Sequence, residues 1–426
     1  MAGGQTKLTR RQVLLTGARA GAALAVPLVV PASILGRDGA VAPSDRIVVG
    51  GIGIGGRGQH VLSDTIANPD VQFVAVCDVR AERREAIKRM ADAKYANTDC
   101  VGYVDMFDLL ERRDIDAVLI ATGDRWHTLA SIIAAKAGKD IYCEKPCSMT
   151  IAESRALANA VRRYGRIYQA GTQRRNVENF VFAIDLVHRG KLGRLKAVHA
   201  NTLDPPTTHD WLPAEPEPPR EVVDWDRWLG PCPWRPYNSN YVRGGWRGFF
   251  DFHGGGILEW GAHTVDLCQW AAQADSTAPV EYEPRGKGVV ARYASGVKLV
   301  MREEGWLGLG TCSVRFEGDE GWVEAGDSGR IELEPESLRS EWSGVADAGT
   351  SPRAHVRDFL NCVKSRKQPR AGASVAAQSH VVCHAAYIAW QLGRKLTFDP
   401  AREDFAGDEA ANRMRSRAIR EPWRLV

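Results

Sequence analysis

The stretch from Asp45 to Ala67 constrains the fold more than any other part of this sequence, because a strand-like apolar run (46–52) leads straight into a glycine-rich turn and a helical pattern. Gly53, Gly55 and Gly58 have the spacing G-x-G-x-x-G. Such glycines let the backbone turn tightly and approach a pyrophosphate at the N-terminus of the following helix. Alone the pattern is weak, so the prediction depends on the strands and helices that come after it in the chain.

The next hundred residues show a regular alternation of strand and helix patterns. Strands are predicted at 71–78, 114–122, 139–144 and 166–173, and helices at 81–96, 126–138 and 151–165. This order predicts a doubly wound parallel sheet that binds ligands at the carboxyl ends of its strands. Thr122, Lys145 and Gln173 follow three of those strand ends. We therefore expect them on the cofactor side of the sheet.

Asp78 ends the second predicted strand, twenty residues after Gly58. A carboxylate at this place accepts hydrogen bonds from the adenosine ribose of NAD and repels the 2′-phosphate of NADP. Arg80 nearby partly offsets that repulsion. The sequence thus favours NAD and leaves NADP open.

The segment 141–148, "IYCEKPCS", ends a buried strand with an acid, a base and a proline. Two interpretations are open. The triplet is either a solvated turn that Pro146 enforces, or it places Lys145 in a cleft where the ammonium takes part in chemistry.

The second half of the chain has a different composition and a different pattern of apolar residues. Residues 204–250 are irregular and rich in Pro, Trp and Arg. Trp246 and Arg247 are the kind of side chains that line a sugar site, although each tryptophan could equally serve to pack the loop. Residues 280–334 alternate in the manner of an antiparallel meander, and helical patterns close the chain.

Glu259, His263, Asp266 and Trp270 are spaced 4, 3 and 4 residues apart in "GGGILEWGAHTVDLCQWA". On one continuous helix they would share a face, and the carboxylate of Glu259 would orient the imidazole of His263. We expect no metal site, because no third ligand stands at the spacing of an H-E-x-x-H helix.

The charge and the cysteine pattern argue against some classes of protein. The net charge of +4 comes wholly from residues 1–42, so the remainder is neutral and no nucleic acid partner is expected. The nine cysteines include no C-x-x-C pair, which argues against a disulfide framework and a zinc ribbon.

Residues 1–42 have the pattern of a leader. Arg10 and Arg11 precede 17 uncharged residues, 20–36, a run short for a membrane span of about 20 residues. The arginine pair resembles a twin-arginine (Tat) signal, so we expect export to the periplasm as a folded protein. An uncleaved leader would act as a membrane anchor, and no other span is expected.

The stretches 53–58, 121–127 ("ATGDRWH"), 143–146 ("CEKP"), 171–175 ("GTQRR") and 254–270, together with Asp78, resemble the Gfo/Idh/MocA oxidoreductase family, most of all its exported branch. The resemblance implies a Rossmann domain at 45–172, an α/β domain with a mostly antiparallel open sheet at 173–400, and a tail at 401–426. The open sheet often supports oligomerisation, so a homo-oligomer is expected.

The resemblance also implies site residues. Lys145, Glu259 and His263 would complete the active site, although Glu259 stands where the family usually has Asp. The residues expected to bind the cofactor are Gly53, Ile54, Gly55, Arg57, Gly58, Asp78, Thr122, His127, Glu144, Lys145 and Gln173. Those expected to bind substrate are Arg174, Trp246, Arg247 and Asp266.

These residues fit an NAD(P)-dependent oxidoreductase acting on a hydroxyl of a sugar, polyol or glycoside. His263 would take the hydroxyl proton and Lys145 would stabilise the alkoxide. Export implies that the dinucleotide is tightly bound. Two alternatives stay open: an NAD-assisted glycoside hydrolase that oxidises its substrate transiently, and a non-catalytic dinucleotide-binding protein.

Overall fold

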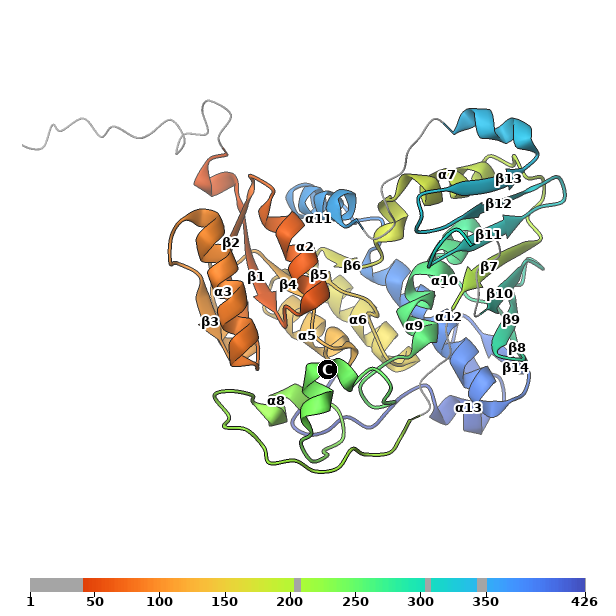
Figure 1. Cartoon of the computed structure of the whole chain (residues 1–426). Coiled ribbons are helices and arrows are strands. Elements are labelled where there is room, and N and C mark those ends of the chain that lie inside the picture. The colour runs from red at the N-terminus through yellow and green to blue at the C-terminus, as the bar shows by residue number, and fades with distance from the viewer. Residues whose placement is uncertain (1–40, 203–207, 303–307, 343–350, 426) are drawn as a thin grey trace, which may run out of the picture. The chain divides into compact units, whose positions relative to one another are not determined.

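The computed structural model describes residues 41–202, 208–302, 308–342 and 351–425, so the predicted Arg10–Arg11 pair lies outside the described residues. The chain divides into two compact units, Met1–Arg46 and Ile47–Val426. Of the first, the structure describes a short turn, η1 (Pro43–Asp45). The second contains both β-sheets (Figure 1). None of the described helices combines the length and the apolar character needed to cross a bilayer.

The first sheet is parallel throughout, with the strand order β3-β2-β1-β4-β5-β6. Its strands are β1 (Ile47–Ile52), β2 (Val71–Cys77), β3 (Val101–Tyr103), β4 (Ala117–Ile120), β5 (Asp140–Cys143) and β6 (Tyr168–Ala170). The helices between them are α2 (Gly56–Ile66), α3 (Ala81–Tyr95), α4 (Met106–Leu110), α5 (Asp124–Lys136) and α6 (Ile151–Tyr164). Apolar strand residues are buried on both faces of this sheet, as in a doubly wound fold. The predicted alternation is confirmed for these elements except β3 and α4, which lie outside the predicted ranges.

Local signals fix the helix that comes after the Glu-Lys-Pro segment. The Thr150 hydroxyl accepts a hydrogen bond from the backbone N–H of Glu153 over 3.1 Å and caps the start of α6. Gly165 ends the helix with a φ of +61°, a conformation that glycine adopts without strain. The segment 144–150 is thereby held between a buried strand and a capped helix.

The second sheet has nine strands in the order β13-β12-β11-β7-β10-β9-β8-β14-β15. They are β7 (Ala197–Asn201), β8 (Glu281–Arg285), β9 (Gly288–Arg292), β10 (Lys298–Arg302), β11 (Val314–Glu317), β12 (Trp322–Ala325), β13 (Ile331–Glu334), β14 (Leu396–Asp399) and β15 (Asp404–Phe405). β7 runs parallel to β10, and the other pairs are antiparallel. The predicted meander is confirmed in type, with β7 inserted between β10 and β11.

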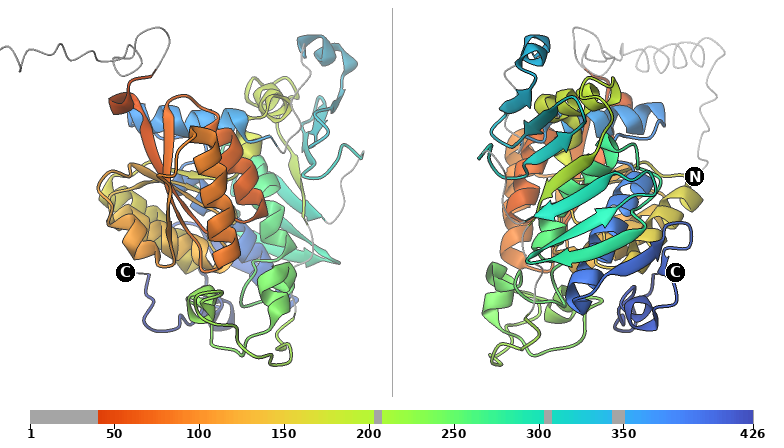
Figure 2. Two further views of the ribbon diagram at one scale, coloured as in Figure 1. Left: turned by 60° about the vertical axis from the view of Figure 1, so that its left-hand side comes forward. Right: turned by 90° about the vertical axis from the view of Figure 1, so that its right-hand side faces the viewer.

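Three helices cover one face of the second sheet: α7 (Glu178–His188), α10 (Gly261–Ala271) and α12 (Ala373–Leu392). The right-hand view of Figure 2 looks onto the opposite face. α12 also packs against α6, and α11 (Arg353–Ser365) packs against α2. Helices from late in the sequence therefore complete the packing of the Rossmann sheet.

The tryptophan-rich excursion forms a compact cluster around α8 (Trp225–Leu229) and the turn η3 (Tyr241–Gly245). The rings of Trp225 and Trp228 stack with centroids 4.7 Å apart. Trp225 is buried in this cluster, so the packing interpretation holds for it. The remaining short elements are η2 (Gln173–Asn176), α9 (Gly256–Glu259), η4 (Glu336–Glu341) and α13 (Glu409–Arg413).

Candidate active site

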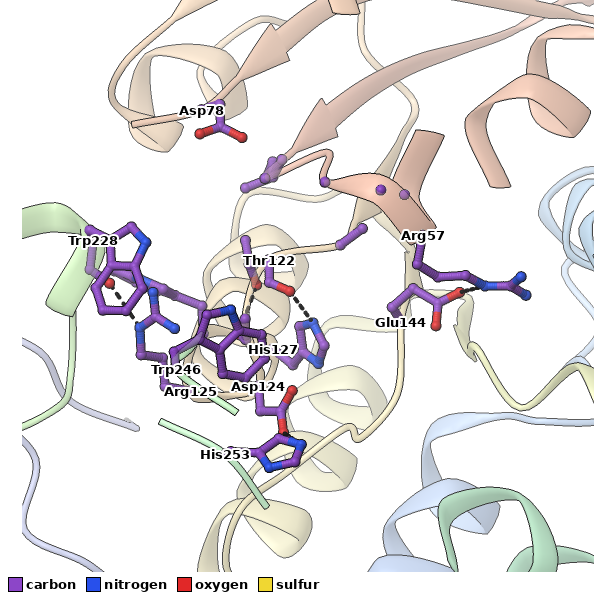
Figure 3. A pocket seen from close by; sticks show the side chains of 18 of the residues that line it. Arg57, Asp78, Thr122, Asp124, Arg125, His127, Glu144, Trp228, Trp246 and His253 are labelled. Atoms are coloured by element: carbon purple, nitrogen blue, oxygen red, sulfur yellow. Dashed lines mark hydrogen bonds and ion pairs between the residues drawn. The ribbon is translucent and has the colours of Figure 1, made fainter. Parts of the chain in front are cut away.

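A cavity of about 530 Å³ lies at the carboxyl ends of β1, β2, β4 and β5. Residues of the excursion and of α9 and α10 line its other side. Figure 3 shows residues from both halves of the chain converging on it. The cavity therefore lies where a doubly wound sheet is expected to bind ligands.

The glycine turn leaves room for a phosphate group beside the cavity. Gly53 has a φ of +67°, and a Cβ there would overlap the side chain of Thr122. α2 begins at Gly56 without any side-chain cap on its first N–H groups, and a Cβ on Gly56 would meet nothing within 4 Å. Exposed N–H groups at a helix N-terminus fit a dinucleotide pyrophosphate. Ile54 does not line the cavity and instead lies in the core with 0% exposure.

Asp78 directly follows β2 and lines the same cavity as the glycine turn, as expected for a residue that binds a ribose. Its Oδ1 accepts a hydrogen bond from the backbone N–H of Arg80 over 2.9 Å. Burial raises the pKa of Asp78, while the charges of Arg83, Arg80 and Arg84 act in the opposite direction. The Arg80 guanidinium donates to the Val242 carbonyl oxygen over 2.8 Å and pairs with Glu82. The Asp78 carboxylate and the arginine guanidinium groups beside it are polar partners that fit a dinucleotide.

Two polar residues hold the loops around the expected nicotinamide position. His127 has Nδ1 2.7 Å from the Pro146 carbonyl oxygen and Nε2 3.2 Å from that of Thr122, so it joins the loops after β4 and β5. Glu144 accepts a hydrogen bond from Gln173 Nε2 over 3.0 Å and has Arg57 Nε at 3.5 Å. All of these residues except Pro146 were expected at the cofactor, and all of them line the cavity.

Lys145 reaches across the cavity to the second half of the chain. Its Nζ donates to the main-chain carbonyl oxygen of Glu259 over 3.1 Å and lies 3.9 Å from Glu259 Oε1. Arg247 Nε lies 3.8 Å from the same carboxylate. A hydrogen bond from His253, together with these cations, lowers the pKa of Glu259 to about 2 despite its partial burial. Lys145 thus lies in the cleft, as the second interpretation of its segment expects.

The expectation that Glu259, His263, Asp266 and Trp270 lie on one helix is wrong, because the helix is interrupted at Trp260, between α9 and α10. The break separates Glu259 from His263. The Glu259 carboxylate bonds His253 Nε2 over 2.9 Å instead, whereas His263 Nε2 lies 2.9 Å from Arg174 Nη1.

Asp266 is not placed at the cavity. Arg175 from η2 binds its carboxylate with two contacts of 2.6 and 2.9 Å, and Ser379 donates to it over 2.6 Å. Trp246 and Arg247 do line the cavity, as does Arg174.

Sequence reasoning missed several residues that line the cavity. Asp124 and Arg125 lie inside the 121–127 stretch but carried no assignment, and His253 directly precedes the glycine triplet. The Arg125 guanidinium lies 3.7 Å from the centroid of the Trp228 ring. Trp423 comes from the C-terminal tail, where its ring meets that of Trp126 edge-on with centroids 4.8 Å apart. The 121–127 stretch and the glycine triplet after His253 were the local signals available.

The site holds acids, bases and aromatic faces but, within the described residues, no group of three His, Cys, Asp or Glu side chains suited to a metal ion. All nine cysteines are buried free thiols. The arrangement suits proton transfer at a polar substrate beside a dinucleotide.

Comparison with protein families gives two matches that together span most of the chain. "Oxidoreductase family, NAD-binding Rossmann fold" matches residues 46–172. "Oxidoreductase family, C-terminal alpha/beta domain" matches residues 208–425. Both belong to the Gfo/Idh/MocA set.

Individual proteins resemble this chain either at low sequence identity or over only part of its length. Inositol 2-dehydrogenase of Salmonella typhimurium is 31% identical over 163 residues, which are 38% of this chain and 46% of that protein. The aligned region thus spans about half of such relatives. The rhizopine catabolism protein MocA of Rhizobium meliloti is 27% identical over 80% of this chain and 94% of its own. The aldose-aldose oxidoreductase of Caulobacter crescentus has the same fold, with a TM-score of 0.59 at 18% identity over 83% of this chain and all of its own.

Proposed function

The chain belongs to the Gfo/Idh/MocA oxidoreductase family, and we propose that it transfers a hydride between a nicotinamide dinucleotide and a hydroxyl-bearing carbon of a sugar, polyol or glycoside. One observation carries the proposal. A single cavity joins the glycine turn and Asp78 to Lys145, His263 and the aromatic side chains of the excursion.

The dinucleotide supplies the hydride acceptor when it is bound. The chain's own residues bind and orient the cofactor and the substrate. Gly53 and Gly55 let the pyrophosphate approach the backbone, and Asp78 binds the ribose. Lys145 stabilises negative charge on the substrate oxygen. Trp246 offers an aromatic face and Arg247 a half-exposed cation to a hydroxyl-rich ligand. The name of the Salmonella relative supports a polyol as the substrate class.

Mass spectrometry of the purified protein, followed by a panel of polyols, aldoses and glycosides, tests this function. Net reduction of the dinucleotide by a polyol or sugar supports it. Cleavage of a glycoside without net reduction would identify the transient-oxidation hydrolase instead. Binding of dinucleotide with no turnover of any carbohydrate would identify a non-catalytic protein.

We also infer that the protein is exported by the Tat pathway and carries its dinucleotide with it. The support is Arg10 and Arg11 followed by an apolar run. Free NAD is scarce outside the cytoplasm, so an exported enzyme needs a dissociation constant in the nanomolar range, equivalent to about −12 kcal/mol. Cell fractionation of the wild type and of a variant with both arginines replaced by lysine tests the export. Gel filtration of the exported fraction tests whether dinucleotide is retained at near-stoichiometric amounts.

The second sheet supports a proposal of self-association. The helices α7, α10 and α12 pack on one of its faces, and the other face carries partly exposed residues of β9, β10 and β11. A homo-oligomer that buries this face is expected, and light scattering after gel filtration would detect it. A monomer at micromolar concentration would contradict it.

A further inference from the structure

His263 is held in one tautomer by its neighbour. Arg174 Nη1 lies 2.9 Å from His263 Nε2, and Asp327 fixes the arginine with contacts of 3.0 and 2.7 Å. A guanidinium donates hydrogen bonds and cannot accept one, so Nε2 must supply its lone pair. The neutral ring therefore carries its proton on Nδ1.

That tautomer makes His263 a donor. Its Nδ1 is buried and has no hydrogen-bond partner among the described residues, and the ring lines the cavity. Accepting a second proton would place an N–H against the guanidinium. Burial, with the charges of Arg174, Lys145 and Arg57 and the nearby His355, lowers the pKa of His263 well below its usual value. At neutral pH the ring is therefore a hydrogen-bond donor and not a proton acceptor.

His253 is held in the opposite way. Its Nε2 lies 2.9 Å from Glu259 Oε2 and 3.7 Å from Asp124 Oδ2. Carboxylates only accept hydrogen bonds, so Nε2 carries the proton and Nδ1 keeps its lone pair. The ring packs edge-on against Trp246, and it too lines the cavity. A carboxylate on one imidazole nitrogen and a free lone pair on the other is the arrangement of a general base.

The Glu259 carboxylate connects this imidazole to Lys145. Lys145 Nζ and Arg247 Nε lie 3.9 and 3.8 Å from Oε1, while His253 bonds Oε2. The charged groups that face His253 are thus two carboxylates, with the two cations behind one of them.

We propose that the two histidines divide the proton chemistry of the proposed function: His253, and not His263 as the sequence predicts, accepts the hydroxyl proton on Nδ1, while His263 keeps its proton and donates a hydrogen bond from Nδ1–H to a substrate oxygen. The O–H bond of the alcohol breaks as the N–H bond on His253 forms. A bound oxidised nicotinamide would be the oxidant and would supply the acceptor for the carbon's hydride, so that the C–O bond would become a carbonyl. Reduction runs through the same groups in reverse.

Nuclear magnetic resonance of the full chain labelled with ring-¹⁵N histidine tests the assignment without any turnover. The variants His253→Gln and His263→Gln assign the two rings, and His60→Gln, at an exposed position on α2, is the control. We expect the neutral ring of His253 to be the Nε2–H tautomer, and His263 to be in the neutral Nδ1–H form between pH 5.5 and 8.5. A proton on Nε2 of His263, or its protonation in that range, would overturn the proposal.

Kinetics supply a second test once a substrate is known. His253→Gln should lower kcat for oxidation by roughly 10²–10⁴-fold and remove the acid limb of the pH–rate profile. His263→Gln should lower the rate and keep that limb. If His253→Gln does not fold, His253→Ala with added imidazole replaces it, and restored turnover is expected. An acid limb lost only with His263→Gln would refute the division of roles. Failure of every carbohydrate to reduce the dinucleotide would refute the proposed function, and the tautomers would still decide the assignment.

Discussion

Lys145 Nζ donates a hydrogen bond to the main-chain carbonyl oxygen of Glu259 over 3.1 Å, although the two residues are 114 positions apart in the sequence. The contact joins the loop after β5 to the last residue of α9. It places the ammonium between the dinucleotide side of the cavity and the substrate side. The Glu-Lys-Pro segment therefore places its lysine in the cavity, which a surface turn would not do.

Replacing Lys145 with alanine should lower kcat by roughly 10²–10³-fold, because the developing alkoxide loses its nearest positive donor. Dinucleotide affinity should be nearly unchanged, and the loss of one partly buried hydrogen bond should cost only about 1 kcal/mol of stability. Steady-state kinetics, dinucleotide titration and thermal unfolding give the three values. Lys136→Ala, at an exposed position near the end of α5, is the matched control. Unchanged turnover in Lys145→Ala would return the segment to the status of a turn.

Asp78 should set the choice of cofactor. Its buried carboxylate lies where a 2′-phosphate would be repelled, so the wild type should bind NAD more tightly than NADP. Asp78→Ser should narrow or reverse that difference, which calorimetric titration with each dinucleotide would measure. Arg80→Ala is the companion variant, since its guanidinium already bonds the Val242 carbonyl oxygen and should have little effect on NAD. A wild-type preference for NADP would contradict this and make Arg80 the determinant.

The strands and helices of the Rossmann half could be predicted because their patterns are local. Buried strands read as apolar runs, and glycine or capping residues mark the helix ends. The nine-stranded sheet was predicted in type by alternation alone. The insertion of β7 between β10 and β11 depends on long-range pairing, which no local pattern carries.

The active site was less predictable for a physical reason. The spacing of Glu259 and His263 fits one helix, and although Gly261 marks a weak point in that helix, no local pattern shows that the two side chains have different partners. Those partners are His253 and Arg174. The pairing of Asp266 with Arg175 likewise depends on tertiary packing.

Substitutions at two glycines of the same turn should distinguish an effect on folding stability from an effect on cofactor binding. Gly53→Ala forces a residue with a Cβ into a φ of +67° and against Thr122, so it should destabilise the protein by about 1–3 kcal/mol. Gly56→Ala meets nothing within 4 Å at the start of α2, so the apo protein should be as stable as the wild type. Any loss in Gly56→Ala should appear only in dinucleotide affinity. Urea unfolding and dinucleotide titration distinguish these effects, and equal loss of stability in both variants would contradict the geometry of the turn.

Acid should destabilise the protein through buried histidines. His355 on α11 is buried with Nε2 2.7 Å from the Ala170 carbonyl oxygen, and burial lowers the pKa of His355 to about 4. An unfolded histidine titrates near 6.5, so the folded state favours the neutral ring. This contribution to stability is complete above pH 6.5 and is lost as the pH falls from 6.5 through about 4.

His355 alone should account for a loss of about 2 kcal/mol in the free energy of unfolding between pH 7.5 and pH 5, since one pKa unit corresponds to about 1.4 kcal/mol. His380, whose pKa burial also lowers to about 4, acts in the same direction. In His355→Gln an amide can still donate to the Ala170 carbonyl oxygen, so the variant should be less stable at pH 7.5 but lose less on acidification. Urea unfolding at pH 7.5, 6 and 5 measures the slope, with His60→Gln as the control that keeps the wild-type slope. If the free energy of unfolding of His355→Gln fell with pH as steeply as that of the wild type, groups other than His355 would bind the protons taken up on unfolding.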